Sequence, residues 1–262
     1  AADFILVNDL KSFIVRRVYI DGILVAENGK SLIEKTVEPE NYVNNFNCSN
    51  KTIEAFHYRA NSIIAEEEEN RNRLHIIEAL DGQLITNKIE ITHDFDSDLL
   101  HPNVEEDLLK IVVVNRYTDT PIAKAFIKNF GLKKGAIASS VAHDSHNIVA
   151  VGVDDASICR AVNLVIEHKG AVSLTAGQGE KNNLPADMVI PLPVAGLMSG
   201  EDGYEVARKY SEIDAAAKQL GSTLSAPFMT LSFMALLVIP HIKISDKGLF
   251  DAGTFSFVNK AH

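Results

Sequence analysis

Five consecutive polar side chains stand between two strongly apolar runs. They are His143, Asp144, Ser145, His146 and Asn147, and the flanking residues 135–138 and 149–153 are glycine, alanine, valine and isoleucine. A turn between strands is normally built from Asn, Asp and Gly and does not need two imidazoles. The His-x-x-His spacing lets both rings face one point, where they could bind a metal ion or move protons while the aspartate orients one ring. The alternative is a polar turn whose histidines are incidental.

A second candidate lies at residues 177–180. Gly177 and Gly179 form half of a nucleotide-binding fingerprint, but the third glycine is missing and no helix follows directly, which favours a flexible loop. Gln178 and Glu180 on that loop could still form hydrogen bonds with the edge of a nucleobase. The segment 227–234 combines aromatic residues, methionines and hydroxyls, and core packing is its expected role.

Strands and helices are both needed to position these residues. Apolar runs and Asp-Gly turns predict strands at residues 4–7, 13–20, 23–27, at two places between 74 and 91, at 111–114 and at 171–175. Capping residues predict three helices, over 120–130, from Asp154 to Gly170, and from about Glu201 to Leu220. The combination predicts an α+β (mixed α/β) fold, a sheet with packed helices.

Composition narrows the class of protein. The chain has 262 residues, of which 46% are hydrophobic and 23% charged, as in ordinary globular proteins. A formal charge of −10 argues against nucleic-acid binding, and the longest apolar run, 233–240, is too short to span a membrane. Two distant cysteines and the lack of a signal-peptide pattern at the N-terminus predict a cytoplasmic protein without disulfides or structural zinc.

Four stretches, in the same order, closely resemble bacterial adenine deaminases. They are residues 140–148, 191–199, 227–233 and 239–249. Around residues 2–10 and 18–22, the chain also resembles the last strands of the small β domain of amidohydrolases, which follow the metal-binding barrel. The resemblance covers nearly the whole chain and is weakest over residues 31–70.

The resemblance implies a hydrolytic reaction, adenine plus water giving hypoxanthine and ammonia. In such enzymes a metal-bound hydroxide attacks C6 while carboxylates move protons to the leaving amine. A pair of Mn²⁺ or Fe²⁺ ions would be held in a (β/α)₈ barrel by a His-x-His pair, a bridging carboxylate, two more histidines and an aspartate. This sequence contains no His-x-His and lacks the eight-fold strand–helix alternation of a barrel. The metal ligands are therefore expected outside this chain, which would be inactive alone.

The resemblance divides the chain into three parts. Residues 1–30 would be the last strands of the amidohydrolase β-sandwich, 31–69 a linker, and 70–262 the adenine deaminase C-terminal domain. The loop from His143 to Asn147 would then face the mouth of the barrel, where it closes the pocket, positions substrate or binds an accessory metal. The expected partners are adenine, the missing barrel and further copies of the chain, because the N-terminal strands lack neighbours.

Two other functions stay open at this point. The chain could be a non-catalytic module that binds purines or scaffolds a barrel. It could also be a separate metal-dependent hydrolase that uses His143 and His146.

Overall fold

The structure is a computed structural model, and it describes residues 2–34, 43–59, 73–92, 99–177 and 185–258. The chain divides into two compact units, Ala1–Asn41 and Tyr42–His262. Within the described ranges no helix is long and apolar enough to cross a lipid bilayer. The two units are described separately below.

The first unit is a four-stranded antiparallel sheet. Its strands, in sheet order, are β1 (Phe4–Val7), β2 (Val15–Ile20), β3 (Ile23–Glu27) and β4 (Lys30–Ser31). The three strands predicted over residues 4–27 are thus confirmed. None of the described side chains of this unit is buried, and Phe4, Ile20 and Ile23 are 44%, 47% and 67% exposed. Residues 2–34 therefore supply no second layer that would bury an apolar face of this sheet.

The second unit is built on an eight-stranded sheet with the order β14-β13-β11-β12-β9-β10-β6-β7. Its strands are β6 (Arg73–Ala79), β7 (Thr86–Thr92), β9 (Leu109–Val114), β10 (Ala123–Lys128), β11 (Ala136–Ser139), β12 (Ile148–Gly152), β13 (Ala171–Thr175) and β14 (Asp187–Pro191). Neighbouring strands run antiparallel except β10 and β6, which are parallel. The apolar runs on either side of residues 143–147 are confirmed as the paired strands β11 and β12.

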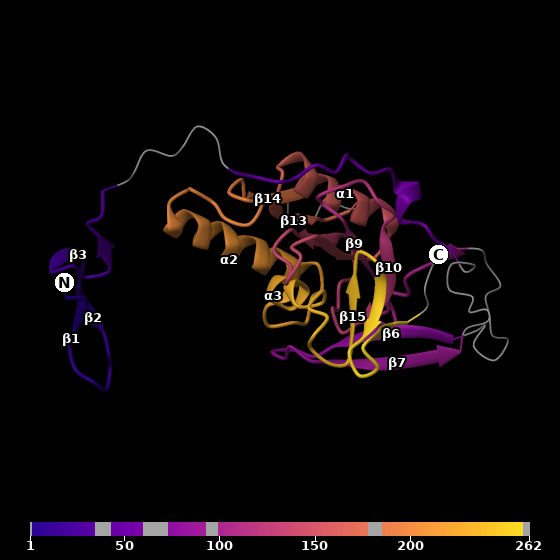
Figure 1. Cartoon of the computed structure of the whole chain (residues 1–262), viewed down its shortest axis with the longest axis horizontal. Helices are drawn as coiled ribbons and strands as arrows, with labels where there is room; N and C mark the ends of the chain where they lie inside the picture. The colour runs from indigo at the N-terminus through magenta and orange to yellow at the C-terminus, as the bar shows by residue number, and fades with distance from the viewer. Residues whose placement is uncertain (1, 35–42, 60–72, 93–98, 178–184, 259–262) are drawn as a thin grey trace. The chain divides into compact units, whose positions relative to one another are not determined.

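Helices cover both faces of this sheet. α1 (Asp155–Glu167) packs on one face, and α2 (Gly203–Gln219) and α3 (Pro227–Ser232) pack on the other (Figure 1). Successive strand residues point to opposite faces, so Val112 packs in the α1 layer and Val113 in the layer of α2 and α3. The Asp154 carboxylate accepts a hydrogen bond from the Ser157 N–H and caps α1 as predicted. The α+β prediction is confirmed.

The helix predicted over residues 120–130 is wrong. Residues Ala123–Lys128 form the strand β10, between β9 and β6. Ile127 belongs to the same core cluster as residues of α2 and α3, whereas Phe126 packs in a separate cluster on the other face. Because both faces of this strand are buried, its apolar residues do not alternate with polar ones, and such a run is compatible with either a helix or a strand.

Several elements of the second unit are not among those predicted. They are the strand β14, the short helix α3, the 3₁₀ helix η1 (Ile53–Phe56), the strand pair β5 (Tyr58–Arg59) and β8 (Leu99–Leu100), and a small sheet of β15 (Ile242–Ser245), β16 (Gly248–Asp251) and β17 (Ser256–Phe257). Residues 43–59, part of the expected linker, belong to this unit, and Phe46 and Phe56 are buried against the α1 layer.

Candidate functional site

Three loops of the second unit meet at one end of the large sheet. β9 ends at Val114, directly opposite the first residue of β12, Ile148. β11 ends at Ser139 beside Val172 of β13, whose first residue pairs with the last of β14. The loops that follow β9, β11 and β14 therefore leave the sheet at the same end. The polar residues 143–147 lie in the second of these loops.

The 143–147 loop is held by backbone contacts and ring stacking. The His143 N–H donates to the Ser232 carbonyl at 2.9 Å, and its ring stacks on Phe233 with centroids 5.0 Å apart. The His146 N–H donates to the Ala142 carbonyl at 2.8 Å, closing a turn in which His146 has a φ of 54°. This turn brings the two imidazoles together, with centroids 5.6 Å apart in an edge-to-face arrangement. The predicted proximity of the two rings is thus observed.

The other three residues of the loop play different parts. Asn147 is buried, and its Oδ1 accepts the Arg116 N–H at 3.2 Å, which ties the loop to the end of β9. Asp144 and Ser145 are exposed. The Ser145 carbonyl accepts a hydrogen bond from the Tyr117 hydroxyl at 2.7 Å. The loop therefore presents two imidazoles and a carboxylate on a fixed backbone.

Arg116 connects the three loops, and the motifs in the sequence do not identify it. Its side chain is buried, with Nη1 donating to the Ala195 carbonyl at 2.9 Å and Nη2 to the Tyr117 hydroxyl at 3.1 Å. The guanidinium also lies over the rings of Phe46 and Tyr117, 5.7 Å and 4.9 Å from their centroids. Residues Arg116 and Tyr117 are called the arginine clamp below. The only sequence signal for it is a polar Asn-Arg-Tyr triplet directly after the buried strand β9.

Glycine is required where the clamp meets the loop after β14. Gly196 has a φ of +71°, and a methyl group added there would come within 2.2 Å of Arg116 Nη1. The guanidinium can approach the Ala195 carbonyl only because this position has no side chain.

The His146 imidazole combines a buried nitrogen, unpartnered in the described part of the chain, with a lowered pKa. Its Nδ1 is buried and has no hydrogen-bond partner among the described residues. Burial lowers the pKa of this imidazole, the charges of His143 and Arg116 lower it further, and Asp144 opposes them. The ring is therefore neutral at neutral pH, with one nitrogen as donor and the other as acceptor. It can exchange a hydrogen bond with a group beyond the described residues.

A further contact brings the small C-terminal sheet to this end. Asn115 Nδ2 donates to an Asp246 carboxylate oxygen at 2.8 Å, and its Oδ1 accepts the Tyr117 N–H at 2.9 Å. Asp246 lies in the turn between β15 and β16. The four stretches that carry the family resemblance, 140–148, 191–199, 227–233 and 239–249, thus all contribute contacts to one cluster around the 143–147 loop.

The remaining predicted residues fall elsewhere. Gln178 and Glu180 lie outside the described residues. In the segment 227–234, Phe228, Leu231 and Met234 are buried in the core, as expected for packing rather than ligand binding. No three His, Cys, Asp or Glu side chains in the described ranges gather in a group that could hold a metal ion.

Comparison with known proteins places this arrangement in a family. Residues 83–256 match the family described as the adenine deaminase C-terminal domain. The chain is 46% identical over 261 residues to the adenine deaminase of Methanosarcina acetivorans, covering 98% of the chain and 45% of that protein. It is 48% identical over 260 residues to that of Sulfurovum sp. and 44% over 264 residues to that of Borreliella afzelii, in each case 98% of the chain and 44% of the relative. The chain thus spans less than half the length of these relatives. It belongs to the adenine deaminase C-terminal domain family.

Proposed function

We propose that this chain is the C-terminal part of an adenine deaminase, and that the complete protein hydrolyses adenine to hypoxanthine and ammonia. One observation carries the proposal: the four stretches that resemble the family converge on a cluster with a fixed pair of imidazoles, one of them with an unpartnered buried nitrogen. The names of the relatives support the reaction. Buried polar atoms of native proteins are almost always hydrogen-bonded. We therefore expect a hydrogen-bond partner for His146 Nδ1, and we place this partner in the rest of the protein or in its substrate.

We place the Mn²⁺ or Fe²⁺ pair in the part of the protein beyond this chain, because the sequence contains no His-x-His pair. When bound, the metal supplies the hydroxide that attacks C6. The 143–147 loop faces that centre and orients adenine or relays a proton, with the neutral His146 ring as donor or acceptor. Gln178 and Glu180 are proposed to contact the base. The expected form is a cytoplasmic homo-oligomer, with the exposed strands of the first unit covered by the rest of the protein or by another copy.

The test is alanine substitution in the full-length enzyme. His143→Ala and His146→Ala are each expected to lower kcat by about a hundredfold or more, the usual contribution of a positioned proton-transfer group. Both variants should remain folded, because the rings lie at the edge of the core. His101→Ala serves as the control, since this exposed histidine lies apart from the cluster, and it should retain wild-type kcat. Wild-type turnover in both loop variants would remove the loop from the mechanism.

The second candidate is a module without catalytic activity of its own, which binds purine or scaffolds a barrel. The chain spans only 44–45% of the length of these relatives, and this short span favours considering a module of this kind. Titrating the isolated chain with adenine in a calorimeter separates the two forms of this candidate. Saturable heat indicates a purine-binding module, and no heat indicates a dependent structural part. Ammonia release from adenine by the isolated chain with added Mn²⁺ would contradict the expectation that it is inactive alone.

A further inference from the structure

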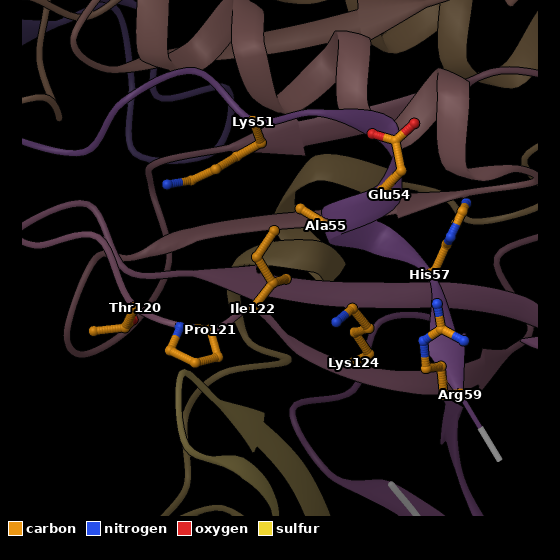
Figure 2. Close-up of a pocket in the computed structure, with 9 residues that line it drawn as sticks. All are labelled: Lys51, Glu54, Ala55, His57, Arg59, Thr120, Pro121, Ile122 and Lys124. Atoms are coloured by element: carbon orange, nitrogen blue, oxygen red, sulfur yellow. The ribbon is translucent and has the colours of Figure 1, made fainter. Parts of the chain in front are cut away.

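A pocket of about 400 Å³ opens on the second unit, and none of the residues that line it belongs to the 143–147 loop or the arginine clamp. It lies between the segment that carries η1 and β5 and the chain entering β10 (Figure 2). It is lined by Lys51, Glu54, Ala55, His57, Arg59, Thr120, Pro121, Ile122 and Lys124. One wall is apolar and four of the other side chains are basic.

The single acidic side chain of the lining does not occupy the pocket. In Figure 2 the Glu54 carboxylate points away from the side of the pocket where Lys124 and Arg59 lie. The net charge of the whole chain is −10, so this concentration of basic groups is a local feature that opposes the overall charge. The pocket is therefore suited to an anionic group.

The nearby carboxylates are already engaged by other cations. Lys51 forms an ion pair with Asp119. Asp155 pairs through one oxygen with Lys110, whose side chain is fully buried, and its other oxygen lies 4.0 Å from His57 Nε2. These two acids therefore neutralise side chains other than Lys124.

Lys124 has no counterion among the described residues. Its side chain is partly buried and forms no hydrogen bond or ion pair with any residue in the described part of the chain. Burial lowers the pKa of its ammonium group, the charge of Lys110 lowers it further, and Asp155 opposes them only in part. A partly desolvated charge without a partner is unfavourable, and a bound anion would relieve the cost.

We propose that this pocket binds a small molecule through an oxyanion group, a phosphate or a carboxylate, with Lys124 as its principal contact. His57 and Arg59 lie beside that contact, and Ala55, Pro121 and Ile122 pack against the body of the ligand. Lysine is a common point-charge ligand for phosphate in proteins, and its flexible stem lets it follow the position of the anion. The site does not depend on the deaminase reaction proposed above.

The test uses the full chain and three simple salts. Backbone amide NMR signals of the lining residues are followed at pH 7 during titration with sodium phosphate, sodium acetate or sodium chloride at matched ionic strength. If only phosphate produces saturable shifts, the pocket is a phosphate site. If acetate also produces saturable shifts, the pocket accepts carboxylates as well. Lys124→Met is expected to weaken the binding at least tenfold.

Two comparisons make the result decisive. Lys128→Met removes a lysine from the same strand without altering the pocket lining and should leave the affinity unchanged. Lys124→Gln repeats the loss of charge with a polar side chain, in case methionine disturbs folding. Shifts that chloride reproduces, or an affinity that both Lys124 variants retain in a folded chain, would overturn the proposal.

Discussion

Replacing Arg116 with methionine is expected to lower the free energy of unfolding of the second unit by about 3 kcal/mol. The substitution keeps most of the buried volume but removes the two guanidinium nitrogens that donate hydrogen bonds, Nη1 and Nη2. The Ala195 carbonyl loses its hydrogen bond from Nη1, and the Tyr117 hydroxyl loses its bond from Nη2. Both acceptors are half-buried, and each lost hydrogen bond to the charged guanidinium costs about 1.5 kcal/mol. Urea unfolding at pH 7, followed by circular dichroism, measures the change.

Two variants test whether the effect belongs to the clamp. Arg160→Met removes a guanidinium that is 47% exposed on α1 and pairs with Asp187 and Glu167, so its effect should stay below about 1 kcal/mol. Arg116→Lys keeps the charge, but one ammonium cannot reproduce the planar two-donor geometry, and it should recover only part of the loss. An unfolding midpoint that Arg116→Met leaves unchanged would show that the clamp does not stabilise this end of the sheet.

The sequence predicts the local framework of the 143–147 loop well. Two apolar β-prone runs separated by a polar segment give the hairpin of β11 and β12, because side chains that cannot be buried must leave the sheet there. The N-cap of α1 is also predicted correctly: Asp154 accepts the Ser157 N–H of the first turn. These features depend on residues near one another in the chain.

Long-range features could not be predicted in the same way. Arg116 reads as an ordinary polar residue after a strand, and its burial results from contacts with Phe46 and Ala195, distant in sequence. The strand β10 resembles a helix in sequence because its partners β6 and β9, and the two clusters that bury its faces, are set by the fold. The proximity of Asp246 to the loop likewise depends on how the small C-terminal sheet packs.

Replacing Lys243 with methionine is expected to stabilise the second unit at pH 7, by about 2 kcal/mol. Lys243 lies in β15 with a fully buried side chain, and its ammonium donates to the Leu84 carbonyl at 2.6 Å. No carboxylate pairs with it in the described part of the chain. Burial lowers the pKa of this lysine from 10.5 to about 8. This lowering of the pKa corresponds to a cost of about 3 kcal/mol to the folded protein at pH 7, which the variant no longer bears. The Leu84 carbonyl loses its hydrogen bond in the variant, which costs about 1 kcal/mol.

The pH dependence distinguishes this cause from a simple gain in apolar packing. Between about pH 8 and 10.5 the unfolded chain binds more protons than the folded chain, so wild-type stability should rise with pH across this window. Below about pH 8 both states are protonated and the full cost is present. Lys243→Met should lose the rise, whereas Lys247→Met, in the exposed turn of the same hairpin, should keep it. Parallel stability curves for wild type and Lys243→Met from pH 7 to 10.5 would mean that Lys243 keeps its charge in the folded protein at no cost.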